Sequence, residues 1–469
     1  MSARSILRRD FLASSLLAAG AAVFGPALWR GLAAAGAPAQ PGNGPYGPLQ
    51  EPDENGLMLP AGFTSRVIAI SGVPVLGSTY VWHIFPDGGA TYATPDGGWI
   101  YVSNSEVPQI GGCGAVRFTR DGDIADAYSI LSGTSTNCAG GPTPWGTWLS
   151  CEETDSGRVW ECDPSGERPA EVRPAMGSFS HEAAAVDPRG KQVYLTEDTG
   201  DGRFYRFTPD TYPSLAAGTL QAARIADPKA VLAGGKSTVT WLPIGDPTGA
   251  DVPTRAQQSG STPFDGGEGC WYDAGVIYFT TKGDNRVWIY RPEEATIELL
   301  YDADRASDPI LTGVDNVFVS PRSGDVFVAE DGGDLDVVMV TPNRVAARLL
   351  KLTGSNHTGS ELTGPAMDPA GERFYFSSQR GMALGTPGLS IGSGFGVTYE
   401  ITGPFRKARV LGAEAPAASR KPAPKGAQTA PAKGDELPAT GESDRTVAAI
   451  ALLGAAGAAA AAAVAGEKR

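Results

Sequence analysis

Basic residues and helical periodicity are both scarce in this sequence, and each scarcity argues against a class of protein. Lysine and arginine total 38 against 52 aspartate and glutamate residues, so the formal net charge is −14. A chain this acidic favours cations as ligands, and we expect no nucleic-acid binding. Apolar residues show almost no helical spacing between about residues 60 and 410, which argues against a helical domain there.

The N-terminal segment has the features of an export signal. The pair Arg8-Arg9 precedes an apolar, alanine-rich stretch from Phe11 to about Ala35, and Ala33-Ala34-Ala35 or Ala35-Gly36-Ala37 offers a cleavage site. An ordinary Sec signal or a buried helix is the alternative. We interpret residues 1–37 as a twin-arginine signal peptide read by the twin-arginine translocase, which carries folded proteins, and residues 38–60 as an N-terminal segment.

The C-terminal segment has the features of a sorting signal. Leu437-Pro438-Ala439-Thr440-Gly441 resembles a sortase motif, and an apolar run from Val447 to Ala465 and the tail Glu467-Lys468-Arg469 follow it. The run is about long enough to span a bilayer as a hydrophobic helix, so a simple membrane anchor is the alternative. Residues 437–469 predict that sortase joins Thr440 to peptidoglycan at the cell surface. The Pro/Ala/Lys-rich residues 412–436 predict a disordered linker.

The cysteines are an odd set for an exported protein. There are five, so at least one is unpaired or a ligand. If Ser156-Gly157 forms the turn of a hairpin, Cys151 and Cys162 fall opposite each other, which predicts a disulfide between them. Cys113 and Cys270 have no obvious assignment.

The middle of the chain repeats one pattern: a turn rich in Asp, Pro and Gly, a short β-branched or aromatic strand, and then polar, often acidic residues. The strands of the six copies contain Val102, Leu149, Leu195, Phe279, Val328 and Phe376. They recur at intervals of about 46 to 49 residues, with one interval of about 84 that holds a Pro/Gly-rich insertion from roughly Pro209 to Asp265. We therefore predict an all-β fold, a six-bladed β-propeller over residues 61–411, with a β-sandwich as the competitor.

The repeat also predicts where the chemistry lies. Equivalent strands of a propeller run in the same sense, so their ends gather on one face. The acidic residues at these ends are Glu106, Glu152, Glu153, Glu197, Asp198, Asp284, Glu330 and Asp331. For any single one, a solvated rim is the simpler interpretation. Converging carboxylates repel one another unless cations or protons neutralise them, and hard divalent cations are the economical answer.

One segment carries a family resemblance. Residues Asn137 to Glu153, which read NCAGGPTPWGTWLSCEE, strongly resemble the signature of the PhoX-type alkaline phosphatases. His181-Glu182, Asp315-Asn316 and the Glu361-to-Pro365 segment resemble further segments of that family. Twin-arginine export is also usual in it, and this chain looks like a compact member.

The resemblance implies a six-bladed propeller that holds iron and calcium and hydrolyses phosphate esters. By resemblance, Cys138 would be a thiolate ligand to iron, and Glu182 and Glu268 carboxylate ligands of the same catalytic cluster. Asp198, Asp315 and Glu361 would be further metal ligands. These residue types suit the metals, because thiolate and carboxylate bind iron while carboxylate and amide oxygens bind calcium.

Each of these assignments has a structural alternative. Cys138 could be a small buried thiol or pair with Cys113. Glu182 could belong to a buried His-Glu pair, and the glycines around Glu268 could mark only a tight turn.

One position departs from the family pattern. In the larger enzymes, the residue two positions before the glutamate that matches Glu268 is an arginine that holds the substrate phosphate. In this chain that residue is Gly266. Either another cation, such as Lys282, Arg203 or Arg380, binds the substrate, or phosphatase activity is weak or altered.

Three functions are therefore open. The first is a phosphatase dependent on calcium and iron, and the second a lactonase-like hydrolase, which needs calcium but no thiolate. The third is a non-catalytic propeller that binds a glycan or protein. Cys138 and its signature favour the first, and Gly266 favours the other two.

The sorting signal gives a direct test. We expect mass spectrometry of wall fragments from the native host to find peptidoglycan attached to Thr440, because the motif, apolar run and charged tail stand in the order a sortase requires. Release of the intact chain, tail included, by detergent alone would contradict this prediction.

Overall fold

Short strands joined by tight turns form the part of the chain that the computed structural model describes, residues 37–382 and 396–407. The linker, the sorting signal with Thr440 and nearly all of the signal peptide lie outside these residues. Within them, no helix is both long and apolar enough to cross a bilayer.

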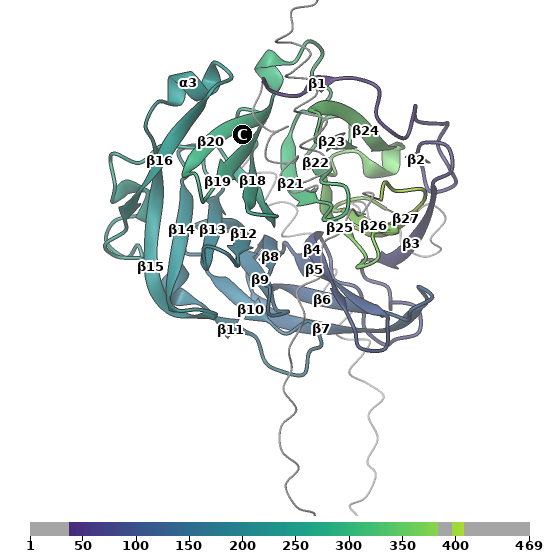
Figure 1. The fold of residues 1–469 in the computed structure, drawn as a ribbon. Helices are drawn as coiled ribbons and strands as arrows, with labels where there is room; N and C mark the ends of the chain where they lie inside the picture. The colour runs from purple at the N-terminus through teal and green to yellow at the C-terminus, as the bar shows by residue number, and fades with distance from the viewer. Residues whose placement is uncertain (1–36, 383–395, 408–469) are drawn as a thin grey trace, which may run out of the picture. The chain divides into compact units, whose positions relative to one another are not determined.

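The strands form sheets that follow one another around a ring (Figure 1), and all pairs of strands except β1 with β24 are antiparallel. The first sheet contains β4 (Pro86–Ala93), β5 (Trp99–Ser105), β6 (Gly111–Phe118) and β7 (Ile124–Thr134). The second contains β8 (Asn137–Pro142), β9 (Trp148–Glu152), β10 (Val159–Cys162) and β11 (Glu171–Val172). The all-β, propeller-like architecture predicted from the repeat is therefore confirmed.

The predicted insertion joins two groups of strands into one nine-stranded sheet. One group contains β12 (His181–Asp187), β13 (Gln192–Glu197), β14 (Phe204–Thr211) and β15 (Ser214–Ile225). The other contains β17 (Gly267–Asp273), β18 (Val276–Thr281), β19 (Arg286–Arg291) and β20 (Thr296–Asp302). Strand β16 (Lys236–Pro243) pairs with both β15 and β20, and α3 (Pro228–Leu232) precedes it.

The next sheet contains β21 (Val314–Val319), β22 (Val326–Glu330), β23 (Asp336–Val340) and β24 (Val345–Leu352). The N-terminal segment adds β1 (Gln40–Pro41) and β2 (Leu57–Met58), which both pair with β24. Single turns of 3-10 helix lie at Pro174–Met176, Thr254–Ala256, Ala303–Arg305 and Ser355–His357. The N-terminal segment is thus part of the folded unit.

The last sheet closes the ring with strands from both ends of the domain. It contains β25 (Leu362–Met367), β26 (Arg373–Ser378), β27 (Val397–Thr402) and β3 (Thr64–Ile70). Strand β3 pairs with β27 from Thr64 opposite Thr402 to Ile70 opposite Val397. Strand β25 in turn contacts β4 of the first sheet. Because β27 has β3 as its partner, it presents no free edge.

The innermost strands of the ring, which contact one another in turn, are β4, β8, β12, β17, β21 and β25. Several of them are rich in glycine and alanine, because they approach one another closely. A Cβ atom on Gly141 of β8 would lie 1.7 Å from the carbonyl oxygen of Ala184 in β12. One on Gly269 of β17 would lie 2.4 Å from the backbone nitrogen of Val317 in β21. The two glycines of the Cys138-Ala139-Gly140-Gly141 segment therefore have a packing cause: only a residue without a side chain fits at these positions.

Aromatic and branched side chains fill the space between neighbouring groups of strands. Phe204 of β14 stacks on Phe279 of β18 with ring centroids 4.2 Å apart, and Phe279 stacks on Trp288 of β19 at 5.8 Å. These rings join the two halves of the nine-stranded sheet and lie in one of several buried hydrophobic clusters. Such packing holds the strands in register and so fixes the ends from which the site is built.

The predicted disulfide between Cys151 and Cys162 is wrong. The β9–β10 hairpin pairs Cys151 with Val159 and Cys162 with Trp148, and all five cysteines are free and buried. The reason is the turn: Glu152 and Arg158 bond through their backbones, which closes the hairpin nearer to β9 than a turn centred on Ser156-Gly157 would.

The pH dependence of stability tests the packing of His357, which is 1% exposed. Its Nε2 accepts from the Asn356 amide at 2.8 Å and its Nδ1 faces Ser378 Oγ at 2.9 Å. Burial lowers the pKa of His357 to about 4, below the ordinary 6.5. Between these two pH values His357 is protonated in the unfolded chain but neutral in the folded chain. The free energy of unfolding therefore falls as the pH falls.

We expect His357→Gln to make the free energy of unfolding less steep between pH 6.5 and pH 4.5, by up to about 1.4 kcal/mol per pH unit. Urea unfolding of both proteins across this range measures the difference, which isolates His357 because all other titrating groups are shared. Parallel curves would show that this histidine does not contribute.

Candidate metal centre

Each innermost strand begins at the same end of the ring, and its pairing with the neighbouring strand is irregular at that end. A register shift lies beside the first residues of all six, between each innermost strand and its neighbour. Bulges of this kind redirect side chains next to functional sites. The second residues of these strands are Asp87, Cys138, Glu182, Glu268, Asp315 and Thr363. Five of the six therefore bring an acidic or thiol side chain to one place.

The ligand atoms lie close enough to share ions. Cys138 Sγ is 3.3 Å from Glu182 Oε1. Three overlapping groups have their ligand atoms within 4.8 Å of one another: Cys138, Glu153 and Glu182; Glu182, Glu268 and Asp315; and Asp315, Asp331 and Glu361. Five of the six predicted metal ligands belong to these groups. The sixth, Asp198, lies beside them, with its Oδ2 3.8 Å from Lys282 Nζ.

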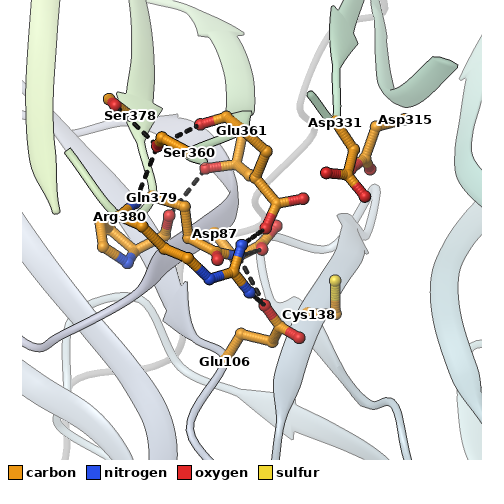
Figure 2. Close-up of polar contacts among 12 residues, drawn as sticks. Asp87, Glu106, Cys138, Asp315, Asp331, Ser360, Glu361, Ser378, Gln379 and Arg380 are labelled. Carbon is orange, nitrogen blue, oxygen red and sulfur yellow. Dashed lines mark hydrogen bonds and ion pairs between the residues drawn. The ribbon is translucent and has the colours of Figure 1, made fainter. Parts of the chain in front are cut away.

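Two cations balance part of this charge. Lys282 follows β18 and places its Nζ 2.5 Å from Glu268, 3.3 Å from Asp331 and 3.8 Å from Asp198. Arg380 follows β26 and pairs with Glu361 and with Glu106, the latter at 3.4 Å. Figure 2 shows the Arg380 guanidinium between these two carboxylates.

Gln379 links the first sheet to the last. Its Nε2 donates to Asp87 Oδ2 at 2.5 Å and to Glu106 Oε2 at 2.6 Å, and its side chain is fully buried (Figure 2). One amide group with two hydrogens thus holds two carboxylates that would otherwise repel each other.

Burial and mutual repulsion raise the pKa of the carboxyl groups. Burial, with Glu268 and Glu153 nearby, raises the pKa of Glu182 well above its ordinary value. Burial also raises the pKa of Glu361 to about 7, although Arg380 opposes the shift. Burial and the neighbouring Asp87 and Glu182 raise the pKa of the Cys138 thiol. Each shift shows that the charged form lacks compensation from the protein alone.

Not every acid at a strand end points to this centre. Glu152, Glu197 and Glu330 are the last residues of their strands, and their carboxylates accept N–H groups of Arg158, Arg203 and Asp336. Asp284 bonds Thr281 and Arg286. These four acids therefore bond to nearby groups and do not line the centre. Side chains alternate along a strand, so only the following residue of each pair faces the centre.

The predicted substrate residue Arg203 also lies apart. Its Nε donates to Ser261 Oγ at 2.6 Å and its Nη1 to the Gly202 carbonyl at 3.1 Å. Of the three candidate cations, the centre contains Lys282 and Arg380.

Sequence reasoning missed Asp87 and Gln379. Asp87 is 1% exposed and stands in β4 where Cys138 stands in β8. Its Pro-Asp-Gly-Gly sequence is typical of a turn, which hid it. The available signal was the likeness of Asp87-Gly88-Gly89 to the glycine-rich starts of the other innermost strands.

The donor set fits metal ions. Glu182 is fully buried, and its Oε2 has no hydrogen-bond partner among the described residues. A buried carboxylate oxygen without a partner costs several kcal/mol unless a cation or proton is supplied, on the order of the penalties known for buried ions. A thiolate among carboxylates suits iron, and the all-oxygen group of Asp315, Asp331 and Glu361 suits calcium.

The segment that carries this centre matches a known family. Residues 109–381, more than half of the chain, match the family described as alkaline phosphatase PhoX. The chain belongs to the PhoX alkaline phosphatase family. No curated protein matches the sequence. Asp87 and Glu106 precede the matched segment.

One solved structure supports the fold, and two others resemble the chain more weakly. The Pseudomonas fluorescens PhoX in complex with vanadate has 16% identity and a TM-score of 0.61, over 76% of this chain and 97% of that one. A Xanthomonas campestris gluconolactonase has 15% identity and a TM-score of 0.38, over 77% and 99%. The calcium-binding regucalcin of Agrobacterium tumefaciens has 13% identity and a TM-score of 0.40, over 74% and 98%.

Within this PhoX chain, the backbone accounts for Gly266. Its φ is +65°, a region that favours glycine, and its carbonyl accepts the Lys282 backbone N–H at 2.8 Å. A Cβ at this position would lie 3.3 Å from Asp198 Oδ1. An arginine would therefore be strained here, and the loop conformation suits glycine.

Metal removal tests the centre. We expect excess chelator to lower the melting temperature by roughly 10 °C, because ions bound only by the folded state stabilise it by about 4 kcal/mol at a thousandfold excess over Kd. Glu182→Gln should melt below the wild type when metal is present and above it in chelator, since the variant loses a ligand and a repelling charge together. An unchanged melting temperature in metal-free protein would contradict the prediction.

Proposed function

We propose that the protein is a metal-dependent phosphatase that hydrolyses phosphate esters at the cell surface, on a propeller whose nine-stranded sheet counts as two of six blades. The observation that carries the proposal is the Cys138 thiol beside Glu182 inside a ring of buried carboxylates. Membership of the PhoX family supports the reaction class.

Iron and calcium are the proposed cofactors. Cys138, Glu153 and Glu182 would hold iron, with Glu268 shared, and Asp315, Asp331 and Glu361 would hold calcium. Bound there, the metals would draw electron density from the phosphate and lower the pKa of a water molecule. Asp198 is the acidic residue that shares Lys282 with Glu268 and would be a further metal ligand.

The remaining residues position these groups. Lys282 contacts carboxylates from three neighbouring strand ends and so keeps Glu268, Asp331 and Asp198 together. The close-packed glycine-rich strands fix the depth at which each ligand sits. Such preorganisation removes the reorganisation that a flexible site would undergo during the reaction.

Sequence motifs at the two ends of the chain support a location at the cell surface. We propose that Arg8-Arg9 directs export by the twin-arginine translocase and that sortase then joins Thr440 to peptidoglycan, releasing the apolar span. Phosphate esters outside the cell would be the substrates.

Because Gly266 replaces the arginine that binds phosphate in the larger enzymes, a lactonase-like hydrolase and a non-catalytic binding propeller are the alternatives. Metal analysis of protein purified from its native host separates them. Iron together with calcium supports the phosphatase, calcium alone a lactonase-like enzyme, and neither metal a binding protein.

Two thiol variants test the role of Cys138. We expect Cys138→Ser to fold, because the sheets keep their pairing, but to lose iron, any thiolate-to-iron absorption band and at least about 100-fold of the phosphatase activity. Cys113, an equally buried thiol in β6, is the matched control. Cys113→Ser should keep metal and activity. A folded Cys138→Ser protein with full iron content and normal hydrolysis of a phosphomonoester would remove the main support for the proposal.

A further inference from the structure

The two cations of the centre are engaged differently. The Lys282 ammonium has three hydrogens and three carboxylate neighbours, Glu268, Asp331 and Asp198. It acts as an internal counter-ion, and binding a substrate would require it to leave one of them. A guanidinium has five hydrogens in a planar fork, and Arg380 meets two carboxylates, Glu361 and Glu106. Within residues 37–382 and 396–407, Arg380 therefore keeps donors for a further anion.

Arg380 is also held in a fixed place. Its backbone N–H donates to Ser360 Oγ at 2.9 Å, and its guanidinium carbon lies 5.3 Å from the centre of the Phe85 ring. Phe85 has a φ of +51°, an uncommon conformation for a bulky residue, which directs its ring beneath the arginine. Glu106, its second partner, is itself fixed by Gln379. The side chain is 22% exposed, so it remains accessible.

The position is suited to a phosphate. Glu361 belongs to the ligand group with Asp315 and Asp331. Arg380 pairs with Glu361 (Figure 2), so it would border an ion held by that group. A phosphate monoester has three terminal oxygens, so two can meet a guanidinium while the third faces the metal centre. A diester has only two terminal oxygens, so it cannot bind the guanidinium through two of them and still present a third to the metal centre.

We propose that Arg380 binds two terminal oxygens of the substrate phosphate, replacing the arginine absent at Gly266, and makes the centre selective for phosphate monoesters over diesters. This inference rests on the proposed phosphatase function. Bidentate guanidinium–phosphate pairs combine charge with a fixed geometry that lysine lacks.

The test compares Arg380→Lys and Arg380→Gln with the wild type on a phosphate monoester and a diester of the same leaving group. We expect kcat/KM for the monoester to fall roughly 10- to 100-fold, mostly through KM, with diester turnover within about threefold. Iron and calcium content should not change. Equal losses on both substrates, or no loss, would overturn the proposal. Loss of metal from Arg380→Lys would also overturn it, because Arg380 would then act by positioning Glu361.

Arg373 provides the matched control. It stands at the opposite end of β26, pairs with Glu400 at 2.7 Å and lies 5.7 Å from the Trp99 ring. Arg373→Gln should lower the melting temperature and leave the monoester-to-diester ratio unchanged.

Titration calorimetry with inorganic phosphate separates this inference from the proposed function. Metal-loaded wild type should bind phosphate at least about tenfold more tightly than Arg380→Gln, even if neither protein hydrolyses an ester. Equal affinities would overturn the role of Arg380 alone. A wild type without hydrolytic activity that still shows the tenfold difference would count against the phosphatase and keep the anion site.

Discussion

Repulsion among buried carboxylates is the constraint on which this structure depends. Asp87, Glu182, Glu268 and Asp315 enter one end of the ring from separate strands, and Glu361 joins them from the loop before β25. No single sheet could assemble such a group, because neighbouring like charges destabilise a strand pair. The ring makes it possible: each sheet contributes one to three acids, and strand pairing and packing far from the centre supply the stability.

The protein meets this constraint partly with its own groups. Lys282 bridges three acids, the Gln379 amide bridges Asp87 and Glu106, and Arg380 bridges Glu106 and Glu361. The Cys138–Glu182 side of the centre contains no such bridge among the described residues, and Glu182 Oε2 has no partner there. The uncompensated side is thus the side with the thiol, where a metal of high charge is the natural complement.

The fold could be predicted because its signals are local: turn residues and short β-branched strands repeat along the chain. The centre could be predicted only in part. Pro86-Asp87-Gly88-Gly89 and Pro95-Asp96-Gly97-Gly98 are the same tetrapeptide, yet the first enters β4 at the metal centre and the second forms an exposed turn. The difference is tertiary, since Gly88 packs against Ala139. Likewise, Glu152 and Glu153 differ by one position, and strand alternation sends only Glu153 to the centre.

The sheet that joins β3 to β27 has a consequence for biosynthesis. Thr64 and Thr402 are 338 residues apart in sequence but bond through their hydroxyls at 2.9 Å. Contacts between such distant segments form slowly, so β27 keeps an unpaired edge until it meets β3, after almost the whole domain has left the ribosome. A nascent chain threaded outward in extended form would separate these two strands across the membrane. Ring closure therefore requires both strands in one compartment. If Arg8-Arg9 directs export of the folded domain, as the sequence predicts, the ring closes before the chain crosses the membrane.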